Sequence, residues 1–196
     1  ANEFTQTEVA KKTAEGYAIY AQTGVAPFCF GMWEQMAELG YAGIRVPEEY
    51  GGMGMGMVEE MLVLEEIGKV NTSVAGTIDA HNLGMNTILH SGSEEQRKKY
   101  LTAAAQGTLV CAAAVSDPAG SSNFEEWSTT VVQDGGDYVL NGTKFFVTNS
   151  DAADLYAVFT QATEPGHGPL DCYLVERDSP GLSTGFLEVF GRAGTN

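Results

Sequence analysis

The fold of this chain is decided between Cys111 and Asn149, in a segment whose two ends read Val115-Ser116-Asp117-Pro118-Ala119-Gly120-Ser121-Ser122-Asn123 and Asn141-Gly142-Thr143-Lys144-Phe145-Phe146-Val147-Thr148-Asn149. Each end is predicted to be a strand edge rich in small hydroxyl residues. Asn141-Gly142 predicts a type I′ hairpin between 138–140 and 143–148, because both central residues of that turn need positive φ. The sequence before this segment is helical in character, and the sequence after it is typical of sheet.

The first half has helical periodicity as far as Gly107. Pro27 is expected in the first turn of one helix, and Ser93 with Gln96 forms a capping box at the start of another. The five predicted helices cover 4–22, 27–39, 58–71, 72–91 and a short stretch after Ser93. Their short connections predict a helical bundle over residues 1–107.

The second half is predicted to be β. Strands are expected over 109–115, 128–132, 138–140, 143–148, 155–160, 171–176 and 187–190, with an exposed turn over 166–169. Helices followed by strands, rather than alternating with them, indicate an α+β fold. We therefore expect an all-α N-terminal domain over 1–107 and an antiparallel β-barrel or sandwich-like domain over 108–196. Because Arg192 to Asn196 looks like the middle of a loop, we expect either a fragment or a β domain completed by another chain.

Composition excludes several partners. The 196 residues include 10 basic and 26 acidic side chains, a net charge of −16, so no cluster of cations is available to bind nucleic acid. An anionic ligand must then be held by local dipoles. No apolar run approaches the ~20 residues of a membrane span, and no signal peptide is recognisable. Three widely spaced cysteines predict no disulfide framework. We expect a cytoplasmic protein, or a mitochondrial matrix protein if the source is eukaryotic.

Most catalytic motifs are missing. The three histidines, at 81, 90 and 167, lack metal-ligand spacing, so no metal site is predicted. His81 is either a structural or surface histidine or one that lines a pocket. The glycine-rich stretch 51–57 follows no strand and lacks the Gly-Lys-Ser/Thr of a phosphate loop. Ser116 lies in no nucleophile elbow. Its hydroxyl and those of Ser121, Ser122 and Thr148 instead offer neutral donors for a polar heterocycle and a phosphate.

Eight short motifs together resemble the acyl-CoA dehydrogenase family across nearly the whole chain. They are Val46–Gly52, Leu64–Glu66, His81–Gly84, Gly92–Leu101, Ser116–Pro118, Asn141–Lys144, Val147–Asn149 and Val175–Leu182. The resemblance implies a subunit with a helical N-terminal domain, a middle β domain and a C-terminal helical domain, of which only the first two are in this chain. It implies FAD as cofactor and 2,3-dehydrogenation of an acyl-CoA thioester.

The resemblance also implies site residues. Val115 and Ser116 are expected to face the flavin pyrimidine ring, Thr148 to reach the N5/O4 edge, and Phe146 to pack on the ring system. Val147 is a further apolar wall. Ser122 falls where the family contacts the FAD pyrophosphate or the CoA arm, so it counts as both a cofactor and a substrate residue.

Two further residues, Asn82 and Leu83, fall on a helix that borders the acyl tail. The catalytic base lies on the C-terminal domain in this family, so no catalytic residue is assigned to this chain. Electrons are expected to pass to an electron-transfer flavoprotein or similar acceptor, in a full-length homo-oligomer that is a dimer or tetramer.

Two alternatives remain open at this point. The same scaffold can serve a flavin-dependent oxidase or monooxygenase, which differs in how oxygen reaches the flavin. The chain can also be a non-catalytic subunit of a hetero-oligomeric acyl-CoA dehydrogenase, supplying walls to a partner's active site.

Overall fold

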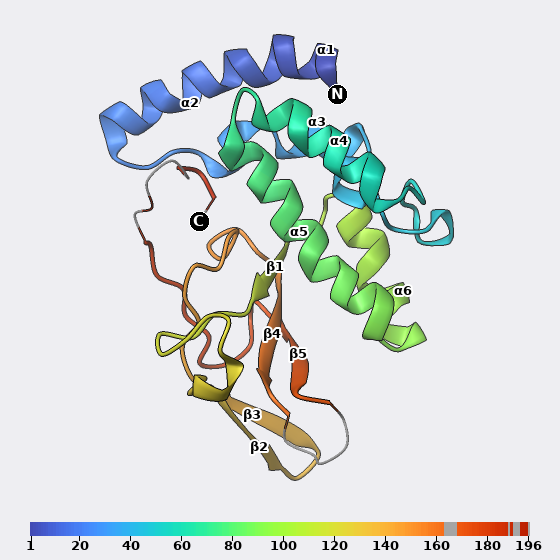
Figure 1. Ribbon diagram of the computed structural model, residues 1–196, viewed down its shortest axis with the longest axis vertical. Helices are drawn as coiled ribbons and strands as arrows, with labels where there is room; N and C mark the ends of the chain where they lie inside the picture. The colour runs from blue at the N-terminus through green and yellow to red at the C-terminus, as the bar shows by residue number, and fades with distance from the viewer. Residues whose placement is uncertain (163–167, 188, 190–192, 196) are drawn as a thin grey trace.

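The computed structural model describes residues 1–162, 168–187, 189 and 193–195, which form a helical half packed on a β half (Figure 1). A long N-terminal helix comprises α1 (Asn2–Phe4), a π-helical turn (Thr5–Val9) and α2 (Ala10–Thr23). It is followed by α3 (Trp33–Glu38), α4 (Met57–Gly68), α5 (Thr72–Ser91) and α6 (Glu94–Ala105). In Figure 1, α5 runs diagonally past the upper end of β1 and ends beside α6. The helical character predicted for the first half is confirmed.

One predicted helix is broken. Instead of a single helix over 27–39, a short 3-10 turn spans Phe28–Gly31 and precedes α3. Cys29 and Phe30 have φ of 46° and 51°, a left-handed backbone that costs about 1–3 kcal/mol per residue outside glycine. The turn directs the Phe30 ring onto Gly16, where an added Cβ would lie 2.2 Å from the ring. Long-range packing therefore overrides the local helical pattern.

The caps of α5 and α6 are local features. Asn71 caps the start of α5, because its Oδ1 accepts from the amides of Ser73 at 2.9 Å and Val74 at 3.2 Å. At α6 the capping box is confirmed, with Gln96 N donating to Ser93 Oγ at 3.2 Å and Ser93 N donating to Gln96 Oε1 at 2.8 Å. Such caps satisfy amides that have no partner within the helix.

The described residues of the β half form two small sheets. The first has the order β1-β4-β5, from Cys111–Ala114, Leu155–Gln161 and Leu170–Glu176. The second pairs β2 (Thr130–Asp134) with β3 (Asp137–Asn141). The α+β class is confirmed, but β1 and β4 are parallel, and the sheets do not close into a barrel within the described residues. Parts of the predicted 166–169 turn and 187–190 strand lie outside those residues, and Leu187 and Val189 are not in a strand.

The predicted Asn141-Gly142 hairpin is wrong. Asn141 is the last residue of β3 and pairs with Thr130, while the stretch 143–148 is not a strand. The hairpin is instead made by Gly135-Gly136 between Asp134 and Asp137, with φ of +64° at Gly135. Asn141-Gly142 and Gly135-Gly136 both carry a turn signal, but only Gly135-Gly136 lies between two strands that pair along their whole length. At position 142, glycine serves close packing, since an added Cβ would lie 2.7 Å from Thr129 Cα.

Gly142→Ala is therefore expected to lower the free energy of unfolding by about 1–3 kcal/mol, as overpacking against backbone does. Thermal or urea denaturation measures the change. Gly136→Ala is the matched control, because a Cβ at Gly136 meets nothing within 4 Å. Equal stability of the two variants would contradict the close-packing role of Gly142.

The two halves share a core rather than touching at their edges. Gly84 of α5 lies against β1, where an added Cβ would be 3.0 Å from Cys111 Cβ. One apolar cluster joins Trp33 and Ile78 of the helices with Ala112 and Tyr156 of the strands. Lys99 of α6 pairs with Glu176 of β5 at 2.8 Å. Within the described residues no helix has the length and apolar character needed to cross a membrane.

Candidate functional site: a pocket between α5 and the β half

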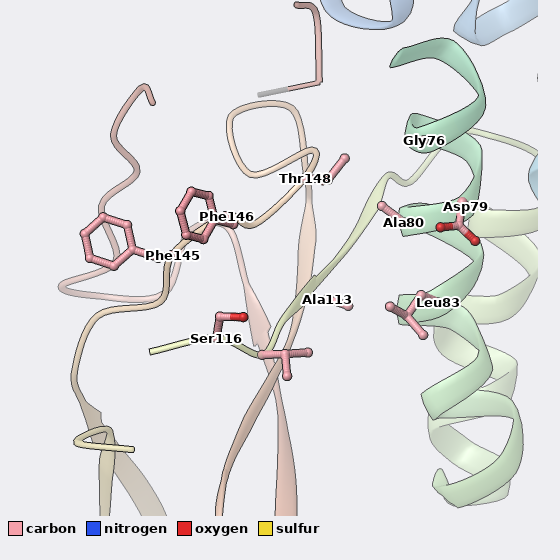
Figure 2. Close-up of a pocket in the computed structure, with 10 residues that line it drawn as sticks. Gly76, Asp79, Ala80, Leu83, Ala113, Ser116, Phe145, Phe146 and Thr148 are labelled. Atoms are coloured by element: carbon pink, nitrogen blue, oxygen red, sulfur yellow. The ribbon is translucent and has the colours of Figure 1, made fainter. Parts of the chain in front are cut away.

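A pocket of about 200 Å³ opens between one face of α5 and the loops at the end of β1 (Figure 2). We call it the α5–β1 pocket, and it is lined by Gly76, Asp79, Ala80, Leu83, Ala113, Val115, Ser116, Phe145, Phe146 and Thr148. In Figure 2, Ala80 and Leu83 extend from α5 toward the side that carries Ser116 and Phe146. Three separate segments of sequence thus meet at one site.

The helical wall follows from the period of α5. Gly76, Asp79, Ala80 and Leu83 recur at the spacing of one helix face, and the small residues Gly76 and Ala80 leave room beside β1. Leu83 is 51% exposed at this wall although it is large and apolar. The sequence interpretation identified only Leu83 here. Stepping back from Leu83 by four and seven residues would have found Asp79 and Gly76.

The β wall is held by contacts between its two loops. Phe145 N donates to Ser116 O at 2.7 Å, which ties the loop after β3 to the end of β1. Ser116 Oγ lies 2.7 Å from Ser121 Oγ. Phe146 has φ of 56° and is 73% exposed, so its ring lies beside the pocket with little protein cover. The wall thus combines a flat apolar surface with neutral hydroxyl groups.

A buried ion pair lies behind this wall. Lys144 Nζ is 2.5 Å from Asp117 Oδ1, donates to Val115 O at 2.9 Å and sits 4.1 Å from the centre of the Trp127 ring. Asp117 Oδ2 also accepts from the amides of Ser128 at 2.6 Å and Thr129 at 2.8 Å. Burial alone would raise the pKa of Asp117, but Lys144 and these donors outweigh it and lower the pKa. The carboxylate is therefore held ionised.

Asn149 anchors the Thr148 end of the pocket. It is fully buried with φ of 70°, and its Nδ2 donates to Thr77 O of α5 at 3.0 Å. Its backbone amide donates to Thr195 O at 2.6 Å. Asparagine tolerates a left-handed backbone better than most residues. The loop that carries Thr148 is thereby fixed to the helix on the opposite side of the pocket.

The structure brings together five of the eight predicted site residues: Val115, Ser116, Phe146, Thr148 and Leu83. The other three lie outside the pocket. Val147 packs against the core, and Ser122 is exposed in the loop after β1. Asn82 is buried, with Nδ2 3.5 Å from Tyr41 O. Asn82 is adjacent to Leu83 in sequence, but its side chain leaves the helix on another face. The ligand roles of all eight remain predictions.

His81 belongs to the fold rather than to the pocket. Its Nδ1 accepts from Cys111 N at 2.9 Å, and its Nε2 lies 3.2 Å from Ala104 O. Because the Cys111 amide donates a hydrogen bond to Nδ1, the neutral ring must carry its proton on Nε2. The Nε2–H group then donates a hydrogen bond to the Ala104 carbonyl. Burial lowers the pKa of His81 to about 4. Of the two roles expected for His81, its position supports the structural one rather than a pocket-lining one.

The donor set of the α5–β1 pocket fits a flat heterocycle. Ser116 and Thr148 provide hydroxyl groups, while Phe146 and Leu83 provide exposed apolar surface. Asp79 places a carboxylate on the α5 wall, which disfavours a phosphate at that point. The lining therefore suits a flat heterocycle such as a flavin ring. Among the described residues no group of three or more histidine, cysteine, aspartate or glutamate side chains is arranged to hold a metal ion.

A helical half joined to small sheets, with a hydroxyl-lined and aromatic pocket between them, defines an α+β protein. Residues 1–108 match the family profile described as "Acyl-CoA dehydrogenase, N-terminal domain", and residues 112–196 match the one described as "Acyl-CoA dehydrogenase, middle domain". The chain belongs to the acyl-CoA dehydrogenase family.

Individual relatives agree with this family. The chain is 36% identical over 172 residues to an acyl-CoA dehydrogenase of Bacillus subtilis, covering 86% of this chain and 45% of that protein. It is 36% identical to a mitochondrial isovaleryl-CoA dehydrogenase of Pongo abelii, covering 84% of this chain and 40% of that protein. The structure of butyryl-CoA dehydrogenase from Megasphaera elsdenii superimposes with a TM-score of 0.79 at 28% identity. The match covers 92% of this chain and 47% of that protein. The chain thus spans less than half the length of these relatives.

Proposed function

We propose that this chain supplies the N-terminal helical domain (1–107) and the middle β domain (108–196) of an FAD-dependent acyl-CoA dehydrogenase. The reaction is the 2,3-dehydrogenation of an acyl-CoA thioester. The observation that carries the proposal is the α5–β1 pocket, in which Val115, Ser116, Phe146 and Thr148 converge from separate segments of a chain of this family. When bound, FAD supplies the acceptor for the hydride that leaves the substrate.

The residues of this chain act by binding and orienting. Ser116 and Thr148 donate hydrogen bonds to the polar edges of the flavin ring, and Phe146 packs on the ring system. Fixed donors stabilise negative charge as it develops, without reorganisation at the moment of reaction. Val147 supports this wall from the core side, and Ser122 contacts the pyrophosphate or the CoA arm.

The α5 wall borders the acyl tail of the substrate. Leu83 contributes apolar surface there, and Asn82 holds the helix in place from the core. We assign no residue of this chain as the base that removes the α-proton. An electron-transfer flavoprotein or similar acceptor takes the electrons, and the full-length protein is a homo-oligomer.

Anaerobic titration of the full-length gene product with acyl-CoAs of graded chain length tests the proposal. Flavin absorbance is expected to bleach with at least one acyl-CoA, whereas the 196-residue piece alone is expected to turn over little or no substrate. A flavin-loaded protein that no acyl-CoA bleaches would overturn the proposal in favour of a non-catalytic subunit. Bleaching followed by peroxide formation in air, in place of acceptor reduction, would favour an oxidase.

A further inference from the structure

Lys144 is a buried cation whose contacts are all accounted for. Its side chain is 8% exposed, and its ammonium group contacts the Val115 carbonyl, the Asp117 carboxylate and the face of Trp127. An ammonium group has three donors, and these three contacts occupy them. Lys144 is therefore not placed to bind a ligand phosphate, even though it lies directly behind the pocket wall.

Of the three contacts of Lys144, the hydrogen bond to the Val115 carbonyl is the one made to a residue that lines the pocket. The carbonyl of Val115 and the amide N–H of Ser116 belong to the same peptide unit, and both residues line the pocket. A cation that donates to the carbonyl withdraws electron density from the peptide and strengthens its N–H as a donor. Within the described residues, the Ser116 amide donates to no protein group, so this donor is available to a ligand.

The neighbouring contact fixes the direction of the same peptide. Lys144 binds the carbonyl of Val115, and the next residue along, Phe145, donates its amide to the carbonyl of Ser116 at 2.7 Å. Two successive carbonyls at the end of β1 are thus held by two successive residues of the opposite loop. This arrangement leaves the Val115–Ser116 peptide little freedom to rotate.

We propose that Lys144 is a positioning residue that strengthens and orients the Ser116 amide as a hydrogen-bond donor to the bound flavin. Asp117 balances the buried charge and holds Lys144 in place. The inference rests on the proposed function, because it takes the ligand of the pocket to be a flavin. A stronger donor at the pyrimidine edge favours the reduced, more negative flavin over the oxidised one, so Lys144 raises the flavin reduction potential.

A matched pair of variants separates charge from packing. Asp117→Asn keeps the cation of Lys144, and the double variant Lys144→Met with Asp117→Asn removes both charges without leaving either unpaired. The two-electron potential of the flavin in the full-length protein is measured by equilibration with redox dyes. Relative to Asp117→Asn, the double variant is expected to lose about tenfold in its preference for reduced flavin, which is about 30 mV toward negative potential. Asp117→Asn itself is expected at or above the wild-type potential.

A second readout does not depend on flavin. The proton of the Ser116 amide is expected to shift upfield in the ¹H–¹⁵N spectrum of the double variant and to stay near its wild-type position in Asp117→Asn. Equal potentials in the two variants, with an unmoved Ser116 signal, would overturn the inference while leaving the proposed function intact. If the wild-type protein binds no flavin, the proposed function fails, and the Ser116 signal alone decides whether Lys144 polarises the peptide.

Discussion

Replacement of His81 by leucine is expected to lower the free energy of unfolding by about 3 kcal/mol or more. Leucine fills a similar volume but leaves the Cys111 amide without its acceptor and the Ala104 carbonyl without the donor 3.2 Å away. Each buried polar group that loses its partner costs about 1–3 kcal/mol. The loss is large because His81 joins α5 to both the end of α6 and the start of β1. Urea denaturation measures it.

His81→Asn is the matched control, since its Oδ1 can still accept from the Cys111 amide. It is expected to lose roughly half as much stability, because only the contact to Ala104 is missing. A leucine variant as stable as the asparagine variant would show that the Cys111 contact contributes little.

The same contact predicts a pH dependence. The pKa of His81 falls from 6.5 to about 4 on folding, so the unfolded chain binds the proton more tightly. The contribution of His81 to the free energy of unfolding is fully present above pH 6.5. It is lost as the pH falls toward 4, and the loss amounts to about 3 kcal/mol. The difference in unfolding free energy between wild type and His81→Asn is therefore expected to narrow over that range. A constant difference would contradict the low pKa.

Local signals predicted the helices well and failed where distant residues decide the backbone. The Ser93 capping box lies within one turn of chain, so sequence alone predicts where α6 begins. The break at Cys29 and Phe30 depends on Gly16 across the fold, which no local pattern reveals. The hairpin at Asn141-Gly142 was wrong for a related reason, because its turn signal competed with that of Gly135-Gly136 and strand pairing decided between them.

The pocket was half predictable from sequence. The motif residues Ser116, Phe146 and Thr148 were found because their residue types and their order along the chain are distinctive. The α5 wall was missed because Gly76, Asp79 and Ala80 belong to none of the recognised motifs, and only the orientation of the folded helix shows that they face the pocket. Lys144 and Asp117 were each recognised within a motif, but their pairing joins two loops that only the folded chain brings together.

Ala80→Trp is expected to abolish tight flavin binding, with an affinity loss of at least about 100-fold. Ala80 projects from α5 toward the Ser116 and Phe146 side of the pocket (Figure 2). An indole in a space of about 200 Å³ leaves no room for a flavin ring between Leu83 and Phe146. A 100-fold loss corresponds to about 2.7 kcal/mol of binding free energy. Fluorescence titration of the apoprotein with FAD measures the dissociation constant.

His90→Trp is the control on the same helix, because His90 is exposed near the end of α5 and does not line the pocket. It places the same indole side chain on the same helix, outside the pocket, and is expected to bind FAD as the wild type does. Thermal denaturation of both variants checks that the helix stays folded. Tight FAD binding by a folded Ala80→Trp variant would move the cofactor away from the α5–β1 pocket. A loss in both variants would instead show that α5 tolerates no tryptophan, and Ala80→Leu would then replace Ala80→Trp as the blocking change.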